Sequence, residues 1–139
     1  MGFVLSFDTK NAVFRIAFEG RLTDADLLAG YAAVSGYVAS HPECASIVDY
    51  SGVTSNEVSM KTVTDLIRSP RAMPKGFLRI NVAPRDAIYG MARMFQILSE
   101  KDRPELRVVR TMDEARVLLG VESLEFLPIG QTDAALHKS

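Results

Sequence analysis

Alternating apolar and polar positions at the start of the chain predict an antiparallel β-hairpin. The segments FVLSF (3–7) and AVFRIAF (12–18) are extended in character, and DTKN between them suits a hairpin loop. In the second segment, large apolar side chains alternate with small or charged ones. The large apolar residues are Phe14, Ile16 and Phe18, and the residues between and after them are Arg15, Ala17 and Glu19. A period of two places these sets on opposite faces of a strand, so we expect one buried and one polar face.

After the hairpin, helical and extended patterns alternate. A helix is expected from Thr23, which is spaced from Asp26 as in a capping box, to about Ser40. Further strands are predicted over 45–50, 78–84 and 106–111, and further helices over 59–69, 87–101 and 112–119. Right-handed crossovers turn such β-α units into parallel neighbours of one sheet. The pattern predicts an α/β fold with a mixed sheet of about five strands and about four helices.

One further pattern bears on how the helices are distributed. In LRINVAP (78–84) the apolar residues Leu78, Ile80 and Val82 alternate with Arg79 and Asn81. The strands predicted over 12–18 and 78–84 thus each show a polar side. We therefore expect the helices to crowd one face of the sheet rather than cover both.

Length and composition are typical of a single small domain. The chain has 139 residues, of which 47% are hydrophobic, enough for one compact core. We expect this domain to span 1–130 and a flexible tail to span 131–139. The 16 basic and 17 acidic residues are interspersed, which gives no footprint for nucleic acid or an anionic membrane.

Cysteine content and hydropathy bear on location. Cys44 is the only cysteine, so an intrachain disulfide and a multi-cysteine metal site are excluded, and a reducing compartment is favoured. The N-terminus lacks a basic region followed by an apolar one, and no apolar run approaches the roughly 20 residues that span a bilayer. We expect a cytoplasmic, soluble protein with no membrane span.

Catalytic and cofactor motifs are scarce, and we predict neither a cofactor nor a metal. GxGxxG, P-loop, HExxH and GxSxG patterns are all missing from the sequence. Asp49 is the best catalytic candidate, because it ends a predicted strand, where α/β proteins build sites. It would act with Asp86 or Arg85. We favour the simpler interpretation, in which Asp49 caps the turn into Ser51 and Gly52, and we expect no enzyme.

The polar stretch after Asp49 is a candidate interaction loop. Its residues with polar or acidic side chains are Asp49, Ser51, Thr54, Ser55 and Glu57. Ser59 follows at the expected start of a helix, where its side chain would be an ordinary N-cap. A phosphate on Ser59 would also suit this position, because a helix N-terminus attracts anions. Such a phosphate would change the surface charge that a partner meets without altering the fold.

The helix predicted over 87–101 has a wide apolar surface. One stripe consists of Ile88, Met91, Phe95 and Leu98, whereas Tyr89, Met94 and Ile97 fall outside it. Neighbouring helices could bury this excess, or it could form a homodimer seam or line a pocket for an apolar ligand. The candidate residues for the last two roles are Tyr89, Met91, Met94, Phe95 and Ile97. Gly90 within this helix predicts close approach of another backbone.

The order of elements and two longer segments resemble known families. IVDYSGV (47–53) is similar to the STAS family of anti-sigma-factor antagonists and sulfate-transporter domains. VAPRDAIYGMARMFQILSEK (82–101) and TMDEARVLLG (111–120) resemble the SpoIIAA-like bacterial branch, which is placed near STAS and the lipid-binding CRAL-TRIO fold. The resemblance covers residues 3–121. It implies a mixed sheet of about five strands packed with helices, and self-association.

The resemblance also implies a role for Ser59, with a departure from the family pattern. STAS antagonists have Asp-Ser-Ser-Gly at the start of a helix, and the second serine receives phosphate. Counted from Asp49, these positions hold Glu57, Val58, Ser59 and Met60 here, so only Ser59 keeps a hydroxyl. A phosphate acceptor survives by position, but the recognition sequence around it does not.

These observations favour a non-enzymatic regulatory or protein-interaction module, a homodimer that contacts a regulatory protein through 51–59. The alternative is a binder of a small apolar ligand, with Tyr89, Met91, Met94 and Phe95 lining its cavity. An enzyme that uses strand-end carboxylates is the third hypothesis.

Overall fold

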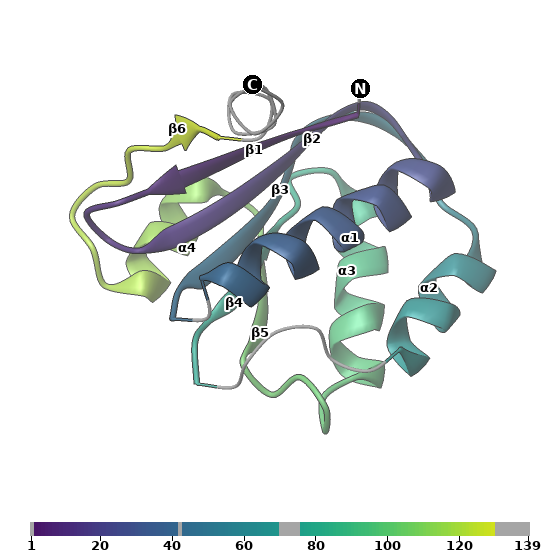
Figure 1. Ribbon diagram of the computed structural model, residues 1–139. Helices are drawn as coiled ribbons and strands as arrows, with labels where there is room; N and C mark the ends of the chain where they lie inside the picture. The colour runs from purple at the N-terminus through teal and green to yellow at the C-terminus, as the bar shows by residue number, and fades with distance from the viewer. Residues whose placement is uncertain (1, 42, 70–75, 130–139) are drawn as a thin grey trace.

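A computed structural model describes residues 2–41, 43–69 and 76–129. The elements, shown in Figure 1, are β1 Phe3–Asp8, β2 Val13–Thr23, α1 Asp24–Ser40, β3 Ala45–Glu57, α2 Met60–Arg68, β4 Arg79–Val82, α3 Asp86–Leu98, β5 Leu106–Val109, α4 Met112–Leu119 and β6 Leu127–Pro128. The tail expected over 131–139 lies outside the described residues. None of the helices in the described part of the chain has the length and apolar character needed to cross a membrane.

The strands form one mixed sheet with the order β5-β4-β3-β2-β1-β6. β1 and β2 pair as an antiparallel hairpin, whereas β2, β3, β4 and β5 are parallel neighbours. The α/β prediction is therefore confirmed, and the arrangement is consistent with a STAS-like fold. β6 adds a two-residue antiparallel strand to β1, which the sequence analysis did not predict.

Three of the four described helices cover one face of the sheet and the fourth covers the other, so the expectation that the helices crowd one face rather than cover both is wrong for α4. α1, α2 and α3 connect β2 to β3, β3 to β4 and β4 to β5, each moving one strand in the same direction. Right-handed crossovers taken in one direction place their helices on the same side. α4 lies against the other face (Figure 1), over a second apolar cluster that includes Ile47, Ile80 and Ala115.

The polar sides of β2 and β4, which supported that expectation, lie on opposite faces of the sheet. Phe14, Ile16 and Phe18 of β2 pack beneath α1, whereas Ile80 and Val82 of β4 belong to the cluster under α4. The intervening polar residues of β4 therefore lie under the three-helix layer, where Arg79 is 4% and Asn81 6% exposed. A central parallel strand is covered on both faces, so its polar side chains are buried as well.

β3 is longer than predicted and continues to Glu57. It keeps pairing with the eleven-residue β2 through two irregularities in register, the first opposite Phe18 and the second between Gly20 and Arg21. β4 pairs with β3 only as far as Asp49. Asp49 therefore lies within the strand, and the expected loop over 51–57 is a strand whose outer edge has no described strand beside it.

Local capping signals place the helix ends. Thr23 and Asp26 form the predicted capping box of α1, and Thr111 and Glu114 form that of α4. Gly120 ends α4 in the left-handed conformation, with φ of 71°, which glycine adopts at little cost. α3 ends at Leu98, three residues before our prediction; Ser99 is its C-cap, and its hydroxyl and N–H both donate to the carbonyl oxygen of Phe95.

Asp8 joins the predicted hairpin loop to the C-terminal segment. Its buried carboxylate accepts hydrogen bonds from the Asn11 backbone and side chain, each 2.9 Å, and from the Glu125 N–H at 2.8 Å. Burial raises the pKa of Asp8, but the hydrogen bonds from Glu125 and Asn11 outweigh it, and the net pKa is below 3.8.

Candidate functional site

A cavity of about 250 Å³ lies between the sheet and the three-helix layer. Its floor comes from β3 and β4, whose pairing sets Ser46 beside Arg79 and Val48 beside Asn81. Alternate residues of a strand share a face, so these four side chains all project toward the helices. The polar alternation in LRINVAP therefore supplies the polar part of a cavity floor.

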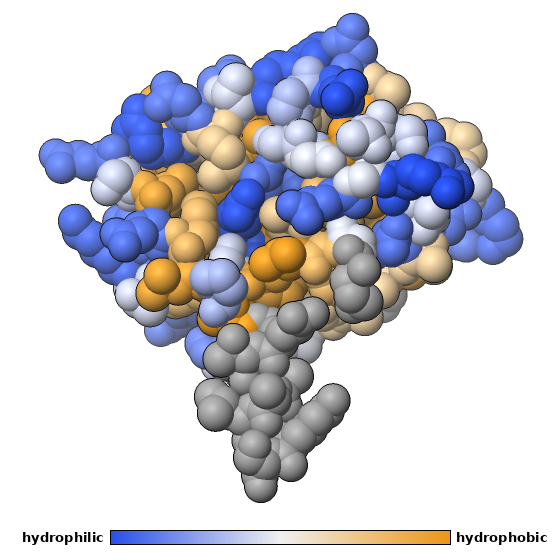
Figure 2. Space-filling model, turned by 90° about the horizontal axis from the view of Figure 1, so that it is seen from above, coloured by the Kyte–Doolittle hydropathy of each residue, from blue (hydrophilic) through white to orange (hydrophobic). Residues whose placement is uncertain are grey.

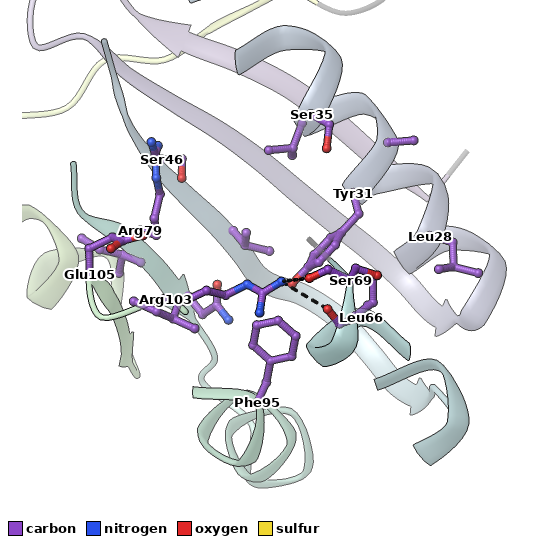
Figure 3. A pocket seen from close by; sticks show the side chains of 16 residues that line it. Leu28, Tyr31, Ser35, Ser46, Leu66, Ser69, Arg79, Phe95, Arg103 and Glu105 are labelled. Atoms are coloured by element: carbon purple, nitrogen blue, oxygen red, sulfur yellow. Dashed lines mark hydrogen bonds between the residues drawn. The ribbon is translucent and has the colours of Figure 1, made fainter. Parts of the chain in front are cut away.

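The walls of the cavity are mostly apolar. Leu28, Tyr31 and Val34 come from α1, Leu66 from α2 and Phe95 from α3. Figure 3 shows these elements converging on the space above β3 and β4.

Arg103 closes one side of the cavity and holds two elements together. Its guanidinium donates to the carbonyl oxygens of Leu66 at 3.2 Å and Ser69 at 3.3 Å, and lies 5.1 Å from the centre of the Phe95 ring (Figure 3). These carbonyls belong to the last turn of α2 and its C-cap, where helical hydrogen-bonding partners run out and a cation is favoured. Arg103 thus pins the end of α2 to the connection between α3 and β5.

Arg79 and Asn81, two polar residues of the cavity floor, are deeply buried. Arg79 donates from Nη1 to the carbonyl oxygen of Cys44 at 2.8 Å. The Asn81 amide, on the same face of β4, makes no hydrogen bond to any other described residue. Burial raises the pKa of the Tyr31 hydroxyl to about 12, although the nearby Arg103 opposes this shift. Tyr31 is therefore a neutral hydrogen-bond donor at neutral pH.

A second, smaller chamber of about 20 Å³ adjoins the cavity. Tyr31, Asn81 and Phe95 border both spaces, and Tyr50 and Met91 border only the smaller one. The Tyr50 ring is 3% exposed and stacks on Phe18 at 5.5 Å. Burial, and then the neighbouring Tyr31, raise the pKa of Tyr50 well above its ordinary value of 10.0. The arrangement can hold a compact apolar molecule and offer it a few hydrogen bonds.

Asp49 lies away from this cavity, on the face that α4 covers. Its carboxylate is 2% exposed, receives Arg15 Nη2 at 2.6 Å and accepts the Ser51 N–H at 2.9 Å. The second contact confirms our favoured interpretation of Asp49 as a capping residue, although it caps a bulge within β3. Asp86, its suggested catalytic partner, instead pairs with Arg110 at 2.7 Å.

Ser59 is the N-cap of α2, as predicted, and accepts the Thr62 N–H at 3.2 Å. It is also bound to α1, because its hydroxyl donates to Asp24 Oδ2 at 2.8 Å and its N–H to Asp24 Oδ1 at 2.7 Å. These hydrogen bonds lower the pKa of Asp24. A phosphate on Ser59 would lie beside the Asp24 carboxylate and be repelled by it. Our prediction considered only the attraction between a phosphate and the N-terminus of α2.

The polar residues proposed as an interaction loop are exposed on β3. They are Ser51, Thr54, Ser55 and Glu57. Glu57 forms two hydrogen bonds with Arg21 of β2, 2.6 and 2.8 Å long, which join the far ends of the two strands. This surface is a two-stranded ribbon.

The residues of α3 that we predicted for a dimer seam or ligand pocket lie in three different places: at the two chambers, against neighbouring side chains, and on the exposed surface. Phe95 borders both chambers and Met91 the smaller one. Tyr89 lies under the guanidinium of Arg110 at 3.9 Å, and Met94 packs half-buried on the main core. Ile97 is 58% exposed.

Two details of the α3 prediction need correction. Leu98, which we placed on the buried stripe, is 61% exposed because the helix ends there. At Gly90, an added Cβ would meet nothing within 4 Å, so no described backbone of the chain approaches it closely.

Exposed apolar side chains also occur at the β1–β6 edge, where Val4 is 45% and Leu127 56% exposed. On the face seen from above, apolar patches lie among polar side chains (Figure 2).

No protein-family model matches this chain, and no curated protein matches it. Within the described residues, no group of three His, Cys, Asp or Glu side chains could hold a metal ion. The candidate site therefore rests on the geometry of the cavity. Our sequence analysis did not assign Tyr31, Asn81 or Arg103 to a site; the polar alternation of β4 was a signal for Asn81 alone.

Proposed function

We propose that this protein is a non-enzymatic module that binds a small apolar ligand in the cavity beneath α1, α2 and α3. The observation that carries the proposal is a space of about 250 Å³ whose helix walls are largely apolar and whose strand floor holds the buried side chains of Ser46, Arg79 and Asn81. Ligand sites in proteins have this composition. The resemblance to domains near the lipid-binding CRAL-TRIO fold supports the same function.

The size of the cavity sets the size of the ligand. An apolar cavity of about 150 Å³ holds benzene, so 250 Å³ suits roughly ten non-hydrogen atoms. A ligand that fills this space would add apolar contacts with its walls and stabilise the folded state by mass action.

Filling the cavity from the protein side tests this proposal. Ser35 of α1 borders the cavity, and Ser35→Phe would occupy part of it. Ala39→Phe adds the same ring at an exposed position of the same helix and serves as the control. Binding of tetralin, an apolar compound of suitable size, is measured by calorimetry. We expect the wild type and Ala39→Phe to bind and Ser35→Phe to lose binding; equal binding by all three would refute the proposal.

The exposed end of α3 favours a second candidate function, a cytoplasmic regulatory module that acts as a homodimer. Ile97 and Leu98 are adjacent and 58% and 61% exposed, so the end of α3 presents apolar surface that a second copy of the chain would cover. The resemblance to SpoIIAA-like proteins supports self-association and a regulatory protein partner. The exposed ribbon of β3 from Ser51 to Glu57, with Ser59 beyond it, is the surface we propose for that partner.

Light scattering after size exclusion tests the homodimer. We expect Ile97→Lys to convert a dimer to a monomer, while Val4→Lys at the opposite, β1 edge leaves it unchanged. A wild-type monomer at high micromolar concentration would contradict this second function.

A further inference from the structure

The smaller chamber has room for one oxygen atom of a ligand. Its volume is about 20 Å³, and a water molecule needs roughly 10–15 Å³. It shares Tyr31, Leu66, Asn81 and Phe95 with the main cavity, so a ligand in the larger space adjoins it directly.

Polar side chains without partners border this chamber. Asn81 is 6% and Tyr50 3% exposed, and neither side chain is hydrogen-bonded to another described residue. The hydroxyl of Tyr31 likewise has no hydrogen bond within the described part of the chain. Buried polar groups in native proteins are almost always satisfied, by protein, water or ligand. Asn81 and Tyr50 are buried and Tyr31 is half-buried beside them, so an oxygen atom in this small space would meet hydrogen-bond donors that no described residue uses.

The burial of this chamber favours an uncharged oxygen over a charged one. Both tyrosines have raised pKa values and stay protonated at neutral pH, so both can donate, as can Asn81 Nδ2. Burial raises the pKa of Tyr31 in spite of the neighbouring Arg103, which means that negative charge is disfavoured here. A carbonyl or hydroxyl oxygen can accept from these donors without that penalty.

We propose that the ligand is an uncharged ketone or alcohol whose oxygen enters the chamber of Tyr31, Tyr50 and Asn81, while an apolar body of roughly ten non-hydrogen atoms fills the main cavity. This inference rests on the proposed function and adds the chemical class of the ligand. It makes Asn81 and Tyr50 the residues that determine specificity.

Matched probes measure the contribution of the oxygen. 1-Tetralone and tetralin share a bicyclic skeleton and differ by one ketone oxygen, and tetralin-1-carboxylate supplies the anionic comparison. We expect the full chain to bind 1-tetralone about tenfold more tightly than tetralin, the difference that one to two net hydrogen bonds make. The carboxylate should bind more weakly than the ketone.

Variants of the chamber should abolish this preference. In Asn81→Leu and Tyr50→Phe the affinity ratio of 1-tetralone to tetralin should fall to below about threefold, with tetralin affinity nearly unchanged. Tyr89→Phe removes a hydroxyl of α3 outside both chambers and should keep the ratio near ten. If Asn81→Leu does not fold, Tyr50→Phe, which deletes a single oxygen, still decides the question.

The outcomes separate this inference from the proposed function. Equal binding of 1-tetralone and tetralin to the wild type would overturn the inference and leave a ligand-binding cavity. Tighter binding of the carboxylate would also overturn it, and would indicate recognition by Arg79 on the cavity floor. Binding of none of the three probes would overturn the inference and count against the proposed function.

Discussion

Replacing Gly30 by alanine tests how closely α1 packs on the sheet that it covers. An alanine Cβ at this position would lie 2.4 Å from Cζ and 2.8 Å from Cε1 of the Phe18 ring. The ring is 1% exposed, stacks on Tyr50 at 5.5 Å and meets the edge of Phe3 at 5.8 Å. Because both sides of the ring are occupied, it has no free direction in which to turn. The helix must move away from the sheet instead.

Two effects of this substitution oppose each other. Alanine is better than glycine in a helix by about 1 kcal/mol, whereas overpacking a core costs about 1–3 kcal/mol. The carbon pair must move apart by about 1 Å to reach ordinary contact, which places the cost at the upper end of that range. We expect Gly30→Ala to lower the free energy of unfolding by about 1–2 kcal/mol.

The same helix contains a matched control. At Gly36 an added Cβ would meet nothing within 4 Å, so Gly36→Ala should keep only the gain in helix propensity and stabilise by about 0.5–1 kcal/mol. Urea denaturation monitored by circular dichroism measures both variants at equal m-value. If Gly30→Ala were as stable as Gly36→Ala, the close packing of α1 on Phe18 would be refuted.

Three further predictions concern the polar contacts. Asp8→Asn should lower the free energy of unfolding by about 2 kcal/mol above pH 4, because the charge-assisted hydrogen bonds to the carboxylate weaken. The pKa of Asp8 in the folded protein lies below 3.8, so urea denaturation should show this difference from wild type disappearing as the pH falls through the folded-state pKa of Asp8. Ser59→Asp should lower the urea midpoint although aspartate is a good N-cap, because it faces Asp24, and Asp24→Asn should restore it. An unchanged midpoint would show that the two carboxylates do not meet. Arg103→Met should loosen the end of α2, seen as faster amide exchange there and tetralin binding weakened several-fold; unchanged exchange would contradict its pinning role.

Much of the fold could be predicted because its signals are local. The capping boxes at Thr23 and Thr111 lie within four residues, and their side chains satisfy the backbone of their own helix turn. The hairpin is likewise encoded by two neighbouring alternating segments and a turn. These interactions form within a few residues, so the order of strands and helices follows from the amino-acid sequence.

The length of β3 was not predictable in this way. Its polar second half, from Ser51 to Glu57, has the composition of a loop, and it is extended because β2 pairs with it over its whole length. The bond between Asp24 and Ser59 joins residues 35 positions apart, at the starts of two helices. Both features depend on strand pairing and helix packing, which bring distant residues together.

The sequence by itself determined that Arg79 and Asn81 alternate with apolar residues on a strand. Only the tertiary structure decided that this polar side lies under α1, α2 and α3, since the direction of the crossovers selects the covered face. It also decided that Tyr31 and Tyr50, from a helix and a strand, meet Asn81 at one small chamber. Periodicity describes the two sides of an element, whereas the surroundings of each side depend on residues far away in the chain.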